Sequence, residues 1–302
     1  AIGLALQLGG PGVTMAALSR LVPFGYPSSR IVRYIEDDPA KPMRLVSTSV
    51  DPNSFGGLLA VIFVLAGSQV IARHRVIPRW VTVPAVMLSG AAMLFTQSRG
   101  SWVGAAAGLA LVALLRYRRL LIPMALGAAA IPVLGIGAHF IDRFAQAVRL
   151  EDPATKLRLS EYQNAFEIIR QHPLFGVGFG QAPSVELQTG VSSIYLTIGE
   201  QTGLLGAALF VLAVGSILLT GFRYWRGRRD SPEGDLSLTL LAALGSALTI
   251  GLVDHYFFNI TFPHMAALFW ILSGLVLALA IPNRGGSRRP VASEASRNPP
   301  GG

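Results

Sequence analysis

The sequence predicts an all-α fold, a polytopic bundle of transmembrane helices, and two observations carry that prediction. The 302 residues are 52% hydrophobic and only 14% charged, whereas soluble domains carry about 25% charged residues. The hydrophobic residues also gather in runs that are long enough to cross a hydrocarbon core of about 30 Å. We expect about seven complete spans after a partial one at 1–17, the runs being 54–72, 80–97, 102–115 (short), 120–138, 192–222, 236–258 and 265–281.

These spans form one expected membrane domain, residues 1–281, followed by a tail. Residues 282–302 are rich in Arg, Ser, Pro and Gly, so we expect a disordered cytoplasmic tail. The chain begins in mid-hydrophobic sequence, AIGLALQLGG, without an initiator Met. We therefore expect a fragment whose earlier spans are missing, rather than a signal peptide.

Composition also excludes several kinds of site. The chain has no cysteine, which excludes disulfides, thiolate metal sites and cysteine nucleophiles. The net charge is +9, but much of the arginine lies in short loops between apolar runs, so the charge does not indicate nucleic-acid binding.

The distribution of arginine predicts the orientation in the membrane. The loops 73–79, 116–119 and 223–235 and the tail carry 3, 3, 4 and 4 arginines, whereas 96–102 has one and 259–264 has none. Short basic loops stay in the cytoplasm. This predicts a multi-pass protein of the cytoplasmic (inner) membrane, with an active face outward made of 18–53, 96–102, 139–191 and 259–264. An outward site without a nucleotide-binding loop must use a substrate that is already activated and already across the membrane.

The outer loop 139–191 is predicted to contain an amphipathic helix. Asp152 suits a helix cap and Pro153 the first helical position, and Pro173 limits the helix at about His172. With successive residues 100° apart, one stripe of this helix is polar and consists of Lys156, Ser160, Gln163, Glu167 and Arg170. The opposite stripe is apolar and consists of Tyr162, Ala165, Phe166 and Ile169. The three glycines of LFGVGFG (174–180) suit tight turns and close backbone approach.

Arg158 falls on the apolar stripe, where a buried guanidinium needs a partner. One interpretation is a stem packed on the core with its head in water, or an ion pair with Glu161. The other is that Arg158 points into a site that receives an anion.

Four segments, in order and in this topology, resemble one family. They are RLVSTSVDPNSFGGLLA (44–60), FTQSRGSWVGAAAGL (95–109), RLSEYQNAFEIIRQHPLFGVGFG (158–180) and SSIYLTIGEQTGLLG (192–206). Over about residues 44–281 the chain resembles the O-antigen ligase/polymerase superfamily. The resemblance implies an inverting glycosyltransferase that polymerises or ligates glycans at the outer face, with no metal, cofactor or nucleotide sugar. The implied partners are an undecaprenyl-diphosphate-linked donor, a glycan or lipid acceptor, and the bilayer.

The resemblance also implies two site arginines. The arginine of the family's Ser-Arg-Gly turn matches Arg99, and an arginine of its large loop matches Arg158. A guanidinium offers a planar fork of donors to phosphate oxygens, so both would stabilise the departing diphosphate. The alternative for Arg99 is an interfacial anchor at a helix end. The ligases carry a His-Asn pair where this chain has Ser192 and Ser193, which leaves polymerase or another glycan transferase open.

Glu200 and His255 complete the candidate catalytic residues. Glu200 lies in an apolar run, and acidic residues at membrane depth are functional candidates. Alternatively its carboxylate bonds locally and orders the turn around Gly199 and Gly203. His255, beside Asp254, would serve as a base in place of the missing histidine, or is structural.

Two other classes of function remain open, a polysaccharide or lipid transporter (flippase) and a non-catalytic assembly protein. Transporters often show two related halves around a mid-membrane site. This chain shows no evident halves, and its polar residues cluster outside the spans, which favours the transferase.

Overall fold

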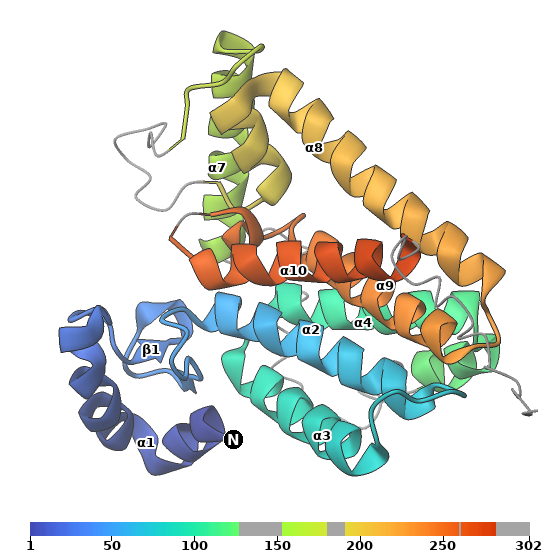
Figure 1. The fold of residues 1–302 in the computed structure, drawn as a ribbon. Coiled ribbons are helices and arrows are strands. Elements are labelled where there is room, and N and C mark those ends of the chain that lie inside the picture. Colours follow the sequence, from blue (N-terminus) through green and yellow to red (C-terminus); the bar gives the residue numbers. More distant parts are fainter. Residues whose placement is uncertain (127–152, 180–190, 260, 282–302) are drawn as a thin grey trace, which may run out of the picture.

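The computed structural model describes residues 1–126, 153–179, 191–259 and 261–281 (Figure 1). The helices are α1 Ile2–Leu18, α2 Pro52–Ile71, α3 Arg79–Thr96, α4 Arg99–Leu115, α7 Pro153–Gln171, α8 Ile194–Gly227, α9 Pro232–Ile250 and α10 Pro263–Ala280. Short 3-10 turns are η1 Ser19–Phe24, η2 Ile35–Asp37, η3 Arg118–Leu120 and η4 Tyr256–Phe258. The strands β1 Arg33–Tyr34 and β2 Met43–Arg44 pair antiparallel.

The predicted all-α, polytopic fold is confirmed. Within the described residues, six helices are long and apolar enough to cross a membrane, and α4, at 17 residues, is shorter, as expected for the third span. Most of the expected span 120–138 and all of the tail 282–302 lie outside the described residues, as do 139–152 and 180–190 of the loop expected at the outer face.

Three boundaries differ from the prediction. Gln97 is left-handed and Ser98 is extended, so α4 begins at Arg99 and this arginine opens a helix instead of lying in a turn. The sixth span ends at Ile250, and a turn followed by η4 replaces its expected last residues. The fifth span is a 34-residue helix that is broken at Gly203, where φ is 67° and ψ is −174°.

The bundle is packed around α9, which contacts α2, α4, α8 and α10. Small residues allow this close packing, as is usual between helices in a membrane. A Cβ added to Gly108 of α4 would lie 2.9 Å from the Ala242 carbonyl oxygen of α9, and one added to Gly104 would overlap the Ile250 side chain. The core is therefore made by backbones that approach each other directly.

The N-terminal helix α1 lies at one side of the bundle in Figure 1, and its Leu4 packs against the core. It is broken at Gly10, where φ is 79° and Pro11 follows. A small separate cluster of Leu18, Ile31 and Val46 joins it to the segment that carries β1 and β2.

The helix α7 marks one end of the bundle. In Figure 1 it stands nearly upright above the left-hand end of α10. The start of α4 and the end of α9 meet α7 at this end, where residues of all three elements line one pocket. The basic loops meet at the other end of the bundle, where their arginines line a different pocket. The arginine-rich loops and the arginine-poor loops, which were expected on opposite sides, therefore contribute to pockets at opposite ends of the bundle.

Candidate active site

Polar contacts dock α7 onto the bundle. The Tyr162 Oη lies 3.1 Å from the Ser192 carbonyl oxygen and 3.2 Å from that of Leu252, so its one proton holds α7 to the start of α8 and to the end of α9. The buried Glu161 carboxylate accepts the Ser192 backbone N–H at 3.0 Å. These backbone groups lie at helix ends, where they need partners from outside the helix.

The buried face of α7 agrees with the prediction except at two residues. Ala165 is fully buried as expected, but Phe166 is 62% exposed and Glu161 takes the buried position. The polar stripe is exposed, as predicted. Phe166 departs from the apolar pattern, and Glu161 is buried because its carboxylate accepts a backbone N–H at the start of α8.

The glycine-rich turn after α7 fills the break in α8. The kink at Gly203 leaves the carbonyls of Glu200 and Gln201 without helical partners, and they accept the N–H groups of Val177 and Gly178 at 2.8 and 3.0 Å. In return Leu204 donates its N–H to the Pro173 carbonyl at 2.7 Å. The predicted close backbone approach is confirmed. The N–H groups of Val177 and Gly178 are occupied in this way, so they do not form a phosphate-binding loop.

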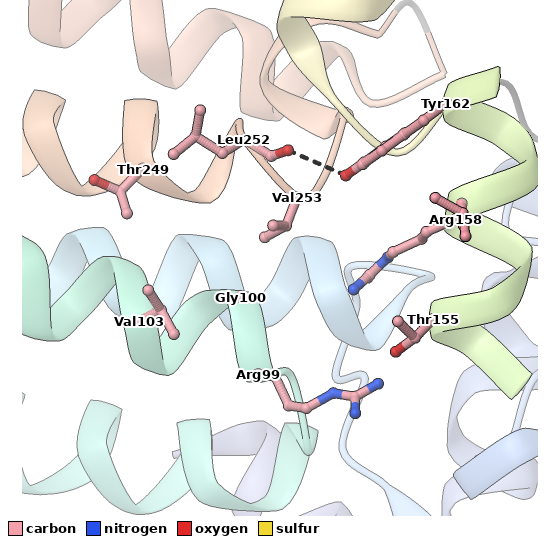
Figure 2. Close-up of a pocket in the computed structure, with 10 residues that line it drawn as sticks. Arg99, Gly100, Val103, Thr155, Arg158, Tyr162, Thr249, Leu252 and Val253 are labelled. Carbon is pink, nitrogen blue, oxygen red and sulfur yellow. Dashed lines mark hydrogen bonds between the residues drawn. The ribbon is translucent and has the colours of Figure 1, made fainter. Parts of the chain in front are cut away.

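A pocket of about 390 Å³ lies between α7, the start of α4 and the end of α9 (Figure 2). Arg99 and Arg158 reach it from two different helices and lie at its α7 end. The rest of its wall is mainly apolar and is made by Gly100 and Val103 of α4, Leu159 of α7, Thr249 of α9, and Leu252 and Val253 in the turn after α9. The pocket is therefore amphipathic, with two guanidinium groups at one end and an apolar wall leading away from them.

Arg99 occupies an unusual position for a cation. It is the first residue of α4, and the Ser98 side chain makes no capping hydrogen bond. The amino end of a helix already carries partial positive charge, so a cation there costs about 0.3–1 kcal/mol. The helix end and the guanidinium together place positive charge at this end of the pocket.

Arg158 is held by an acidic partner. Its Nη2 lies 3.8 Å from the Oδ2 of Asp254, and its side chain is 26% exposed. Glu161, the partner considered from the sequence, is engaged with Ser192 instead. Burial raises the pKa of Asp254, against the opposing effect of His255 and Arg158. The ion pair fixes the guanidinium at the rim of the pocket while leaving part of it accessible.

The other two candidates do not line this pocket. His255 adjoins it through Asp254, with the imidazole Nδ1 3.7 Å from the Asp254 Oδ1. That nitrogen is buried and makes no hydrogen bond within the described part of the chain. Glu200 is buried on α8 beside the glycine-rich turn, within electrostatic range of Glu161. The structure thus brings Arg99 and Arg158 together, places His255 next to them, and keeps Glu200 apart.

Sequence reasoning missed Asp254 as the partner of Arg158 and Tyr162 as the docking residue. The sequence could have indicated that Asp254 needs a cationic partner, because an acidic residue at the end of an apolar span is costly without one. Ser192 and Ser193 join the start of α8 to its neighbours, Ser192 through its backbone groups. The Ser193 Oγ lies 3.3 Å from the Gly251 carbonyl oxygen, and Ile194 donates its N–H to the same oxygen at 2.9 Å.

Comparison with known proteins gives one family. Residues 84–211 match the family model described as O-antigen ligase. The matched segment includes α4 with Arg99, α7 with Arg158 and the start of α8 with Glu200, whereas Asp254 and His255 follow it. No curated protein matches the chain.

Proposed function

We propose that this multi-pass membrane protein, whose residues 84–211 match the O-antigen ligase family model, polymerises or ligates glycans carried on undecaprenyl diphosphate. The reaction takes place at the outer face of the cytoplasmic membrane, at the end of the bundle where α7 lies. The acceptor is a hydroxyl of a second glycan or of a lipid.

The amphipathic pocket is the observation that carries this proposal. A prenyl diphosphate sugar has two phosphates and a long hydrocarbon chain, and the pocket has two guanidinium groups and an apolar wall. Arg99 and Arg158 suit the diphosphate because a guanidinium donates two parallel hydrogen bonds to phosphate oxygens. Val103 and Leu252, about half exposed on the apolar wall, suit the first prenyl units.

The chemistry is a displacement at the anomeric carbon. The acceptor oxygen forms its bond to that carbon from the face opposite the diphosphate, and the C–O bond to the diphosphate breaks with its electron pair, which inverts the configuration. Negative charge grows on the diphosphate, where Arg99 and Arg158 stabilise it. A preorganised donor of this kind contributes on the order of 10²–10³ in rate. Guanidinium groups take the place that a metal ion would otherwise fill, so the reaction needs none.

The acceptor's proton must pass to a base. The contacts from Arg158 to Asp254 and from Asp254 to His255 favour His255 over Glu200, because they bring its imidazole beside the pocket. Asp254 is then a positioning residue for both Arg158 and His255.

The test is a transfer assay with purified protein and an undecaprenyl-diphosphate-linked oligosaccharide. We expect longer glycans and release of undecaprenyl diphosphate. Arg99→Lys and Arg158→Lys should each reduce transfer strongly, since lysine keeps the charge but loses the fork. Arg20→Lys, an exposed arginine outside the pocket, is the matched control. Movement of the donor across vesicles without release of undecaprenyl diphosphate would refute the transferase and support the flippase.

A further inference from the structure

A second pocket, of about 900 Å³, lies at the end of the bundle away from α7 and is strongly basic. Six arginines line it: Arg73, Arg79, Arg116, Arg118, Arg119 and Arg229. Asp230 lies 3.9 Å from Arg73 and 2.8 Å from Arg116, and Asp235 lies 3.9 Å from Arg116. In the part of the chain that the structure describes, six guanidinium groups thus face two neutralising carboxylates.

Arg79 shows that this charge is not explained by local stability. It is exposed and is the first residue of α3, whose amino end is already partly positive. A cation at that position costs free energy unless an anion is near it. The pocket therefore suits an anionic group from outside the chain.

An apolar groove of about 380 Å³ continues from the basic pocket. The two share Val70, Ile71 and Leu120, and the groove extends along α2, α3 and α4 past Phe63, Val86 and Leu109. A free phosphate would use only the basic half of this surface. A ligand with an anionic head and a hydrocarbon chain would use both halves.

We propose that this surface binds an anionic phospholipid, with its phosphate among the arginines and an acyl chain in the groove. The arginines belong to loops predicted to face the cytoplasm, so the lipid comes from the inner leaflet, where basic pockets between membrane helices receive such headgroups. The site lies at the opposite end from the proposed diphosphate pocket and is independent of the transferase reaction.

Native mass spectrometry of the full chain, titrated with phosphatidylglycerol or with phosphatidylcholine of the same acyl chains, tests this site. We expect the wild type to bind phosphatidylglycerol more tightly. Arg79→Gln with Arg119→Gln changes two exposed side chains of the pocket. This double variant should lose on the order of 30-fold in affinity for phosphatidylglycerol, from about 1 kcal/mol for each basic residue near the headgroup. Arg20→Gln with Arg170→Gln, which removes the same charge at exposed positions elsewhere, should keep the preference.

Two further measurements separate a lipid from a free anion and keep the test independent of folding. Val86→Trp fills the groove without changing charge and should weaken phosphatidylglycerol binding. Excess inorganic phosphate should not displace the bound lipid, and displacement would show a free-anion site and refute the lipid proposal. Equal binding of both lipids by the wild type, or an unchanged preference in Arg79→Gln with Arg119→Gln, would also refute it.

Discussion

Substituting Gly176 tests whether the glycine-rich turn and the break in α8 form one structural unit. Gly176 has a φ of +66°, and an added Cβ would overlap the Glu200 carbonyl oxygen. Gly178, two residues later, has a φ of +93° but nothing within 4 Å of an added Cβ. The two glycines therefore share the backbone conformation and differ in the contact, which makes Gly178→Ala the matched control for Gly176→Ala.

The expected losses of unfolding free energy follow from the backbone conformation and from the steric overlap. An alanine in the left-handed region costs roughly 1–2 kcal/mol, and both variants incur this cost. At position 176 the overlap also separates Val177 and Gly178 from the carbonyls of Glu200 and Gln201. Each of those two hydrogen bonds contributes roughly 0.5–1.5 kcal/mol. We expect Gly176→Ala to lose about 2–5 kcal/mol of unfolding free energy, and Gly178→Ala about 1–2 kcal/mol.

Thermal unfolding in detergent, followed by intrinsic fluorescence, measures the difference. At roughly 2–4 °C per kcal/mol for a large domain, Gly176→Ala should lower the Tm by about 4–20 °C and Gly178→Ala by about 2–8 °C. Gly203→Ala should resemble Gly176→Ala, because its added Cβ would overlap the Leu174 carbonyl oxygen. Equal losses at 176 and 178 would refute the close backbone contact as the source of stability.

Three other changes test the orientation, the shared pocket and the buried acid. Single cysteines are placed at the exposed positions Gln163 and Arg226 and treated in intact cells with a thiol reagent that cannot cross the membrane. The cysteine at 163 should react and the one at 226 should not. The reverse pattern would overturn the orientation. Arg99→Lys combined with Arg158→Lys should reduce transfer by much less than the product of the two single losses, because both side chains act on one leaving group. A loss in the double variant equal to that product would show that the two arginines act independently. Burial raises the pKa of Asp254, so its contribution to stability is complete below about pH 3.9 and declines as pH rises through the raised value. In Asp254→Asn the Tm should not show this decline with rising pH, and transfer activity should be lost. A variant whose Tm falls with pH in the same way as that of the wild type would contradict this.

Local signals in the sequence predicted the parts of the site that depend on nearby residues. Pro153 and Pro173 bound α7 as expected, since the effect of proline on a helix is local. The glycines at 176 and 178 marked a turn with close backbone approach, and their positive φ values confirm it.

Contacts between distant residues were not predictable in the same way. Arg158 was recognised as needing a partner, but Asp254 follows almost a hundred positions later and only packing brings the two together. The unexpected burial of Glu161 depends on the backbone N–H of Ser192, which periodicity does not register. Arg99 and Arg158 were expected at one cavity because of the family resemblance, and the structure places both at one pocket, while their catalytic roles stay a prediction.

The chain is anchored to its neighbours on both sides of residues 180–190. Before residue 180 the chain is fixed to α8 through Val177 and Gly178, and after residue 190 it is fixed again through Ser192 and Ile194. A segment whose ends are both held can change length cheaply, because each doubling of a loop costs only about 0.6 kcal/mol of closure entropy. A change of length between the two anchors should therefore leave the pocket lined by Arg99 and Arg158 in place.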